Sequence, residues 1–253
     1  MLELIQQNGE CSIDELTGEF GVSSMTIRRD LQDMAEEGLV IRTHGGATPA
    51  PKISFEFRFL ERMHEQSKEK EEIASIAVSL IRPGQTVMLD SSTTTLAIAR
   101  KLVDMSGITV VTTSLPIASE LFGCPNITVI LLGGVLRNDS PDLTGALTEY
   151  SLELIRADIA FIGADAIDLT GHIYNTNPEI GQLLKRMAGA SARVYAVADH
   201  TKIGKCALMR FACVTDWYGL VTDSGLLKKH ANTLKRVGVD LIQKVADVRG
   251  NHE

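Results

Sequence analysis

The sequence has few cysteines, few aromatic residues and no long hydrophobic run. Among its 253 residues, no stretch of about 18 uncharged apolar side chains occurs, which excludes a membrane-spanning helix. Its first ten residues lack the basic start and apolar stretch of a signal peptide, so we expect a cytoplasmic protein. The four cysteines are scattered and form no C-x-x-C pair, which argues against a metal site or a disulfide framework.

An excess of positive charge is also missing. The net charge is −7, and residues 1–52 alone hold four basic and nine acidic side chains, a net of −5. Binding to the phosphate backbone needs a positive face, so this balance disfavours a nonspecific coat on nucleic acid. Any DNA-binding function must therefore depend on the local arrangement of a few basic side chains.

The beginning of the chain predicts two capped helices. Ser12 and Glu15 have the spacing of a capping box, which satisfies the free N–H groups that open a helix, and predict a helix over 12–20. Gly21 follows as a tight turn. Ser23 is placed to cap a second helix, which we expect to end at Gly38.

The second helix has one apolar face and one polar face. Ile27, Leu31 and Met34 recur at helical spacing and form its buried stripe. Residues 39–42 are extended in character, and Gly45-Gly46 is expected to supply the positive φ of a hairpin tip. Helix, turn, helix and hairpin in this order predict a winged helix-turn-helix over residues 1–48.

The exposed face of the second helix is a candidate DNA-reading surface. An arginine guanidinium binds a base edge or a phosphate, while serine hydroxyls and helix-start N–H groups bind the DNA backbone. The alternative is a protein-interaction domain in which the two arginines pair with Asp30 and Asp33. The candidate DNA contacts on the helix and its cap are Ser23, Ser24, Met25, Arg28, Arg29 and Gln32, and the wing adds Arg42, Thr43, His44 and Gly45.

A second, larger domain follows a change in composition. Pro49 and Pro51 oppose helix formation and favour an extended connector, so we place a linker at 49–66 and a second domain at 67–253. In that domain short apolar runs alternate with helical patterns, which predicts an α/β fold with a parallel sheet covered on both faces. The expected strands are Thr86–Leu89, Ile108–Thr112, Ile127–Leu132, Ile159–Ile162, Val194–Ala198 and Tyr218–Thr222, and the expected helices lie at 67–80, 94–104, 115–122, 146–156, 179–190 and 224–236.

Polar side chains follow these strands, at the edge of the sheet where ligands bind in open α/β folds. The segment from Asp90 to Thr95 follows a strand and opens a helix, so its hydroxyls and N–H groups can converge on an anion. The alternative is a plain helix cap. No Walker A loop or G-x-G-x-x-G motif occurs, so we expect no nucleotide cofactor.

The other predicted strand ends add residues to the same edge. Glycines let a ligand approach the backbone closely, and a lysine supplies positive charge for a phosphate or sugar oxyanion. Each residue alone could be a turn glycine or a surface lysine, and their common position after strands carries the prediction. The candidate ligand contacts are Asp90, Ser91, Ser92, Thr93, Thr94, Thr113, Ser114, Gly133, Gly134, Gly163, Asp165 and Lys202.

Two residue strings at the start of the chain resemble the DeoR family of bacterial transcriptional regulators. They are the recognition segment Phe20-Gly-Val-Ser-Ser-Met-Thr-Ile-Arg-Arg-Asp-Leu31 and the wing Gly38-Leu-Val-Ile-Arg-Thr-His-Gly-Gly-Ala47. The resemblance implies sequence-specific binding to double-stranded operator DNA, usually at sugar-utilisation genes. It assigns that role to Thr26, Arg28, Arg29 and the wing.

The second domain is similar to the sensor domain of the same family, which resembles ribose-5-phosphate isomerase. The similarity covers residues 70–245 and implies that Lys202 and the segment from Asp90 to Thr94 bind a phosphorylated sugar, with Glu179 near its hydroxyls. Ser92 stands where family loops usually have glycine, which narrows the cradle or adds a hydroxyl. The family also implies a homodimer or homotetramer.

Two functions therefore compete. In the first, the chain is a repressor of a carbohydrate-utilisation operon, and a sugar phosphate shifts its sensor between states of different DNA affinity. In the second, it is a sugar-phosphate isomerase in which Glu179 or Asp165 moves a proton and Lys202 stabilises an oxyanion. Only the shared fold supports the isomerase, and a shared fold is a poor guide to a reaction. The DNA-reading domain also argues against it.

Overall fold

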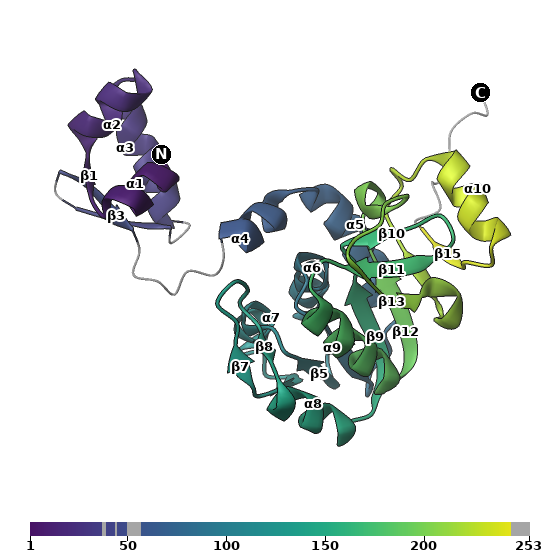
Figure 1. The fold of residues 1–253 in the computed structure, drawn as a ribbon. Helices are drawn as coiled ribbons and strands as arrows, with labels where there is room; N and C mark the ends of the chain where they lie inside the picture. Colours follow the sequence, from purple (N-terminus) through teal and green to yellow (C-terminus); the bar gives the residue numbers. More distant parts are fainter. Residues whose placement is uncertain (37–38, 44, 50–56, 244–253) are drawn as a thin grey trace, which may run out of the picture. The chain divides into compact units, whose positions relative to one another are not determined.

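The protein forms two compact units, Met1–Phe57 and Arg58–Glu253 (Figure 1). In this computed structural model the residues described are 1–36, 39–43, 45–49 and 57–243. The predicted helix stop at Gly38, the wing residue His44 and part of the predicted linker lie outside them. Among the helices in the described ranges, none is both long and apolar enough to cross a membrane.

The first unit is a small helical domain with a three-stranded antiparallel sheet in the order β1-β3-β2. Its core contains Ile5, Leu16, Ile27 and Leu31, all almost fully buried. This arrangement confirms the predicted winged helix-turn-helix. The elements in chain order are α1 (Leu2–Asn8), β1 (Cys11–Ser12), α2 (Ile13–Phe20), α3 (Ser24–Glu36), β2 (Val40–Arg42) and β3 (Gly46–Pro49).

The helix caps confirm the local predictions. The amide of Ser12 donates to Glu15 Oε2 over 2.7 Å and the amide of Glu15 donates to Ser12 Oγ over 3.2 Å, which completes a capping box. Gly21 ends α2 in the left-handed conformation with φ of 64°. At the next helix, Ser23 Oγ accepts the amide of Thr26 over 3.2 Å. The side chains thus satisfy backbone groups that would otherwise be unpaired.

The expected role of the glycine pair in the wing is wrong. Neither Gly45 nor Gly46 is among the described glycines with positive φ. Gly46 instead opens β3 and pairs with Ser12, and a Cβ atom there would overlap the carbonyl oxygen of Cys11. Close strand approach, rather than a left-handed turn, therefore requires glycine at this position.

The predicted linker contains regular structure at both of its ends. Pro49 belongs to β3 and pairs with Val40, at a point where β1 no longer lies alongside. Helix α4 (Phe57–His64) occupies the later part, and its Phe59 is 2% exposed within the core of the second unit. The apolar pair Phe59 and Met63, one helical turn apart, explains why this segment packs rather than remaining an extended connector.

The second unit is built on a seven-stranded parallel sheet in the order β15-β14-β12-β9-β4-β5-β6. The predicted parallel α/β fold is confirmed, and two expected strands have the bounds given by the sequence. In chain order the strands are β4 (Thr86–Leu89), β5 (Ile108–Thr112), β6 (Ile127–Leu131), β9 (Ala157–Gly163), β12 (Ser191–Val197), β14 (Gly219–Val221) and β15 (Leu241–Ile242).

Helices cover both faces of this sheet (Figure 1). Met88 and Ile162 face a core layer that includes α9, whereas Leu89 and Phe161 face a layer that includes α5 and α6. Neighbouring strand residues thus point to opposite layers. The helices are α5 (Ser67–Ser79), α6 (Thr93–Leu102), α7 (Leu115–Leu121), α8 (Ala146–Glu153), α9 (Pro178–Gly189) and α10 (Lys228–Arg236).

Several short elements were not expected from the sequence. A second sheet, antiparallel in the order β10-β11-β13, and a hairpin of β7 and β8 flank the main sheet. They matter for function because β11 leads directly into α9, next to the carboxyl ends of the parallel strands. These elements are β7 (Val135–Leu136), β8 (Leu143–Thr144), β10 (Ala166–Ile167), β11 (His172–Asn175), β13 (Met209–Cys213) and the 3-10 helices η1 (His200–Lys202) and η2 (Val214–Asp216).

Candidate DNA-binding surface and ligand pocket

Helix α3 presents one polar face to solvent. Ile27 and Leu31 are buried on its inner side, and Met25 on the outer side is 74% exposed. The helix therefore carries the polarity that the sequence predicted, with its predicted contacts available to a partner. The predicted residues on this exposed face are Ser24, Met25, Thr26, Arg28, Arg29 and Gln32.

The two arginines of α3 are available for phosphates and bases. Within the described ranges, neither Arg28 nor Arg29 forms an ion pair, so the structure does not support the alternative in which they pair with Asp30 and Asp33. Adjacent guanidinium groups on a helix cover a wide arc. One of them is thus able to read a base while the other holds the backbone.

A hydrogen bond joins the wing to α3. Arg42 Nη1, on β2, donates to Gln32 Oε1 on the recognition helix. At the turn, the amide of Thr43 donates to the carbonyl of Gly46 over 3.0 Å, and the carbonyl of Gly45 accepts the amide of Ile13 over 2.9 Å. Helix and wing therefore share polar contacts at the predicted DNA surface.

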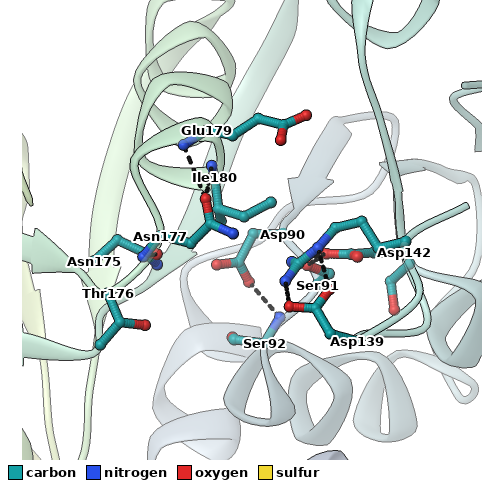
Figure 2. Close-up of polar contacts among 12 residues, drawn as sticks. Asp90, Ser91, Ser92, Asp139, Asp142, Asn175, Thr176, Asn177, Glu179 and Ile180 are labelled. Carbon is teal, nitrogen blue, oxygen red and sulfur yellow. Dashed lines mark hydrogen bonds and ion pairs between the residues drawn. The ribbon is translucent and has the colours of Figure 1, made fainter. Parts of the chain in front are cut away.

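In the second unit, the Asp90 carboxylate organises the loop after β4 (Figure 2). Its Oδ1 accepts the amide of Ser92 over 3.0 Å and the hydroxyl of Thr95 over 2.7 Å, and its Oδ2 accepts the amide of Gly163 over 2.8 Å. Burial raises the pKa of Asp90, while these donors lower it. Asp90 thus holds two strand ends together, a structural role next to the pocket.

Ser92 caps α6 rather than leaving its hydroxyl free. Its Oγ accepts the amide of Thr95 over 3.2 Å, and its backbone is extended, so glycine is not required for the loop's conformation. The Ser92 side chain lies against Gly163, because a Cβ atom on Gly163 would approach Ser92 Oγ to 2.6 Å. A serine at position 92, where a glycine would leave open space, therefore narrows the gap beside Gly163.

A pocket of about 350 Å³ lies at the start of α6. Thr93 and Thr94 line it from the first turn of the helix, where free N–H groups favour an anion. Lys202, on η1, lines the same pocket beside Thr201. The positive helix end and the lysine together form a site suited to a phosphate.

Lys70, on α5, is a lining residue that the sequence analysis did not propose. Its side chain is buried at 6% exposure, and Nζ donates to the carbonyl of Glu65 over 2.6 Å and to the carbonyl of Arg62. The pKa of Lys70 is lowered to about 8, chiefly by burial; the charge of Asp199 opposes this shift and that of Lys202 adds to it. One signal was present: Lys70 shares the helical face of Ile73, Ala74 and Ala77, which are all buried.

A second compartment of about 110 Å³ adjoins the first. The two share Arg62, Ser92, Gly163, Ala164 and Asp165 in their walls. Figure 2 shows Asn175, Thr176 and Asn177 gathered before α9, across from Asp90 and Ser92. The second compartment is thus enclosed by segments far apart in the sequence.

The amide side chains of the second compartment have defined orientations. Asn177 Oδ1 accepts the amide of Glu179 over 2.9 Å, and Asn175 Oδ1 accepts the amide of Asn177 over 2.8 Å, so their NH₂ groups remain as donors. Asp165 Oδ2 accepts both the amide and the hydroxyl of Thr176, each over 2.8 Å. These donors and acceptors are of the kind that binds hydroxyl groups.

The positive charge of Arg137 in this compartment is balanced by two carboxylates. Arg137 forms ion pairs with Asp139, over 2.8 Å, and with buried Asp142, over 3.4 Å. The hydrogen bond from Arg137 also lowers the pKa of Asp139. Because two carboxylates face this guanidinium, the surrounding charge favours neutral hydroxyl groups over a second phosphate.

The structure brings most of the predicted ligand contacts together. Asp90, Ser91, Ser92, Thr93, Thr94, Gly163, Asp165 and Lys202 line one or both compartments. Among the lining residues that sequence reasoning missed are Arg62, Lys70, Arg137, Ser140, Asn175, Thr176 and Asn177. A separate cavity of about 330 Å³, lined by Ser191 and Tyr218, lies at the opposite, amino ends of β12 and β14.

Five predicted contacts lie outside both compartments. Thr113 and Ser114 are buried, and Ser114 caps α7. The carbonyl of Gly133 accepts the hydroxyl of Thr148, while Gly134 packs closely against β8. Glu179 is exposed at the start of α9, and Figure 2 shows its carboxylate directed away from Asp90.

The fold and site define a class of protein: a DNA-binding regulator with a winged helix-turn-helix and a separate α/β sensor. Residues 1–51 match the DeoR-like helix-turn-helix domain and residues 65–224 match the DeoR C terminal sensor domain. The chain belongs to the DeoR family of transcriptional regulators. Its function is thus transcription regulation through DNA binding.

Named relatives agree with this assignment over most of the chain. The HTH-type transcriptional regulator GolR of Listeria innocua is 33% identical, with 90% of each chain covered. The glycerol-3-phosphate regulon repressor of Escherichia coli K12 is 32% identical, with 88% of each covered. Among solved structures, ribose 5-phosphate isomerase A from Methanocaldococcus jannaschii is similar over 55% of each chain, with 17% identity and a TM-score of 0.42.

Proposed function

We propose that the protein represses carbohydrate-utilisation genes and that a phosphorylated sugar weakens its binding to operator DNA. The observation that carries this proposal is the convergence of Lys70, Lys202 and the first turn of α6 on one pocket at the carboxyl edge of the sheet. Two lysines and a helix start supply the positive charge and N–H donors that a phosphate needs. The adjoining compartment supplies the hydroxyl-binding groups.

The charge distribution supports a single phosphate with a neutral polyol attached. The larger compartment holds the lysines, whereas Arg137 in the smaller one is balanced by Asp139 and Asp142. The NH₂ groups of Asn175 and Asn177 and the carboxylate of Asp165 fit the donors and acceptors of sugar hydroxyls. A phosphate thus enters at α6 and the sugar lies toward α9.

Operator recognition follows from the exposed face of α3. Arg28 and Arg29 supply the base and phosphate contacts, and Arg42 of the wing lies beside Gln32. Paired half-sites require more than one copy of the recognition helix, so we infer a homodimer or homotetramer on DNA. The sensor acts by binding its ligand with different affinity in the two DNA-binding states.

The test is binding of the full chain to DNA from upstream of its own gene, across a salt series. Each of a panel of sugar phosphates is added in turn, with the matching unphosphorylated sugar as its control. We expect selective, salt-sensitive binding that one sugar phosphate weakens and its parent sugar does not. DNA binding that no sugar phosphate alters would contradict the proposed effector class. Equal binding to unrelated DNA would contradict the proposed sequence-specific recognition of an operator.

A further inference from the structure

Lys70 contacts two parts of the second unit at once. Its Nζ donates to carbonyl oxygens of Arg62 and Glu65, at the end of α4, and the same side chain lines the larger compartment with Lys202. A lysine ammonium has three donors and no acceptor. Two donors therefore serve α4, and the third is the one left for an anion in the pocket.

The turn between α4 and α5 depends on this arrangement. Gln66, between the helices, has φ of 51°, the positive φ found at no other non-glycine residue of the described ranges. Such a conformation costs free energy for a side chain with a Cβ atom. The carbonyls just before this turn have left the helical ladder, and Lys70 satisfies them in place of the next helical turn.

Helix α4 is also the first described element after residue 49, so the covalent path from the DNA-binding unit reaches the sensor there. Arg62, on the same helix, lines both compartments of the pocket. The helix that receives the connector is thus part of the ligand-binding site. A ligand in the pocket would therefore contact α4, the helix to which the connector is attached.

We propose that Lys70 is a positioning residue that joins a bound phosphate to the end of α4, so that ligand binding fixes this helix on the sensor. This inference rests on the proposed function, because it needs a phosphate in the larger compartment. The phosphate takes the third donor of Lys70 and keeps the ammonium charged, which strengthens its hydrogen bonds to the α4 carbonyls. The connector is then anchored more firmly when the ligand is bound.

The experiment measures hydrogen exchange in α4 of the full chain, with inorganic phosphate as the probe and chloride at equal ionic strength as the reference. Phosphorus NMR measures phosphate binding in the same samples. We expect phosphate to slow exchange at the end of α4 by about tenfold, the effect of one strengthened charge-assisted hydrogen bond. Lys70→Met should remove this protection, and Lys68→Met, at an exposed position of α5, should retain it.

The outcomes separate the inference from the proposed function. If phosphate binds and α4 exchange does not slow, or slows equally in Lys70→Met, the role of Lys70 is overturned while the pocket stands. If phosphate does not bind the wild-type chain, both are overturned. A second measurement avoids the variant: between pH 7 and pH 9 the phosphate concentration that gives half-maximal protection in the wild-type protein should rise, because phosphate binds the ammonium form of Lys70. A midpoint concentration that does not change over this range would overturn the inference.

Discussion

The amide of Gly163, at the end of β9, donates to Oδ2 of Asp90 over 2.8 Å and ties two neighbouring strand ends together. The other carboxylate oxygen accepts donors from Ser92 and Thr95 within its own loop. All of these bonds shape the wall of the ligand pocket. Asp90 therefore fixes the conformation of the loop after β4.

Replacing Asp90 by asparagine should lower stability. An amide has one acceptor oxygen, so a donor now satisfied by the carboxylate would face an NH₂ group. We expect the free energy of unfolding of the sensor to fall by about 1–3 kcal/mol, the cost of an unsatisfied buried group. Urea denaturation followed through Trp217 fluorescence measures it. Asp104→Asn, at an exposed site, is the control, and equal stability of the two variants would contradict the role of Asp90.

A pair of substitutions tests the contact between Ser92 and Gly163. Gly163→Ala places a Cβ atom 2.6 Å from Ser92 Oγ and 2.7 Å from Ser92 Cβ. Overpacking of this kind costs about 1–3 kcal/mol, so the single variant should be less stable and bind the sugar phosphate more weakly. Adding Ser92→Gly should recover most of the loss. Additive effects in a double-mutant cycle would show that the two positions do not interact.

Lys202 should be needed for the response to the ligand but not for DNA binding. Lys202→Ala removes a positive charge from the larger compartment, so we expect about tenfold weaker phosphate binding and a matching loss of the effector response. Lys205→Ala is a matched control, since Lys205 is exposed and does not line the compartment. Isothermal titration calorimetry measures the affinity. Normal sugar-phosphate affinity in Lys202→Ala would show that the ligand does not bind in this compartment.

Ligand affinity should fall in alkaline solution. The pKa of Lys70 is lowered to about 8, with burial as the largest cause and smaller contributions from the charges of Asp199, Lys202, Glu65 and Arg62. The ammonium form of Lys70 is the one that binds an anion. Sugar phosphates lose their second proton near pH 6, so above pH 7 the change belongs to the protein. We expect Kd to rise toward about tenfold per pH unit above the pKa. Titrations at constant ionic strength check this, and Lys70→Met should show a flatter profile.

Arg29→Ala should weaken discrimination between operator and unrelated DNA. The side chain is exposed on α3, so its removal leaves the core of the first unit intact. We expect a loss of about 1–3 kcal/mol for the specific sequence, the value of one good base contact. Arg82→Ala, exposed in the second unit, controls for net charge in gel-shift titrations. Retained selectivity would mean that a different face reads the bases.

The parallel sheet was predictable because buried strands leave near-continuous apolar runs. Thr86–Leu89 and Ile108–Thr112 have the expected bounds for this reason. The antiparallel sheet was not predicted, because its strands are short and β11 (His172–Asn175) includes half-exposed residues. Helix α4 was not predicted because Pro49 and Pro51, just before it, favour an extended connector. Phe59, which is buried in the core of the second unit, was the apolar signal for the helix.

The candidate site was predictable where it follows a strand directly. Asp165 and Lys202 were found in this way, because parallel strands end at one edge. Asn177 and Arg62 reach the same pocket from β11–α9 and from α4, and no local pattern shows that these segments fold back to it. Glu179 lies in the chain between the lining residues Asn177 and Ile180, but its own side chain is exposed and lines neither compartment.

The hydrogen bond from Arg42 to Gln32 has a consequence for the free protein. These two side chains, which we propose as DNA contacts, form a hydrogen bond with each other in the absence of a duplex. A base pair that offers equivalent partners permits an even exchange, whereas a base pair that does not leaves both groups without their former bond. We therefore expect the hydrogen bond between Arg42 and Gln32 to disfavour binding to DNA sequences that lack the matching donor and acceptor.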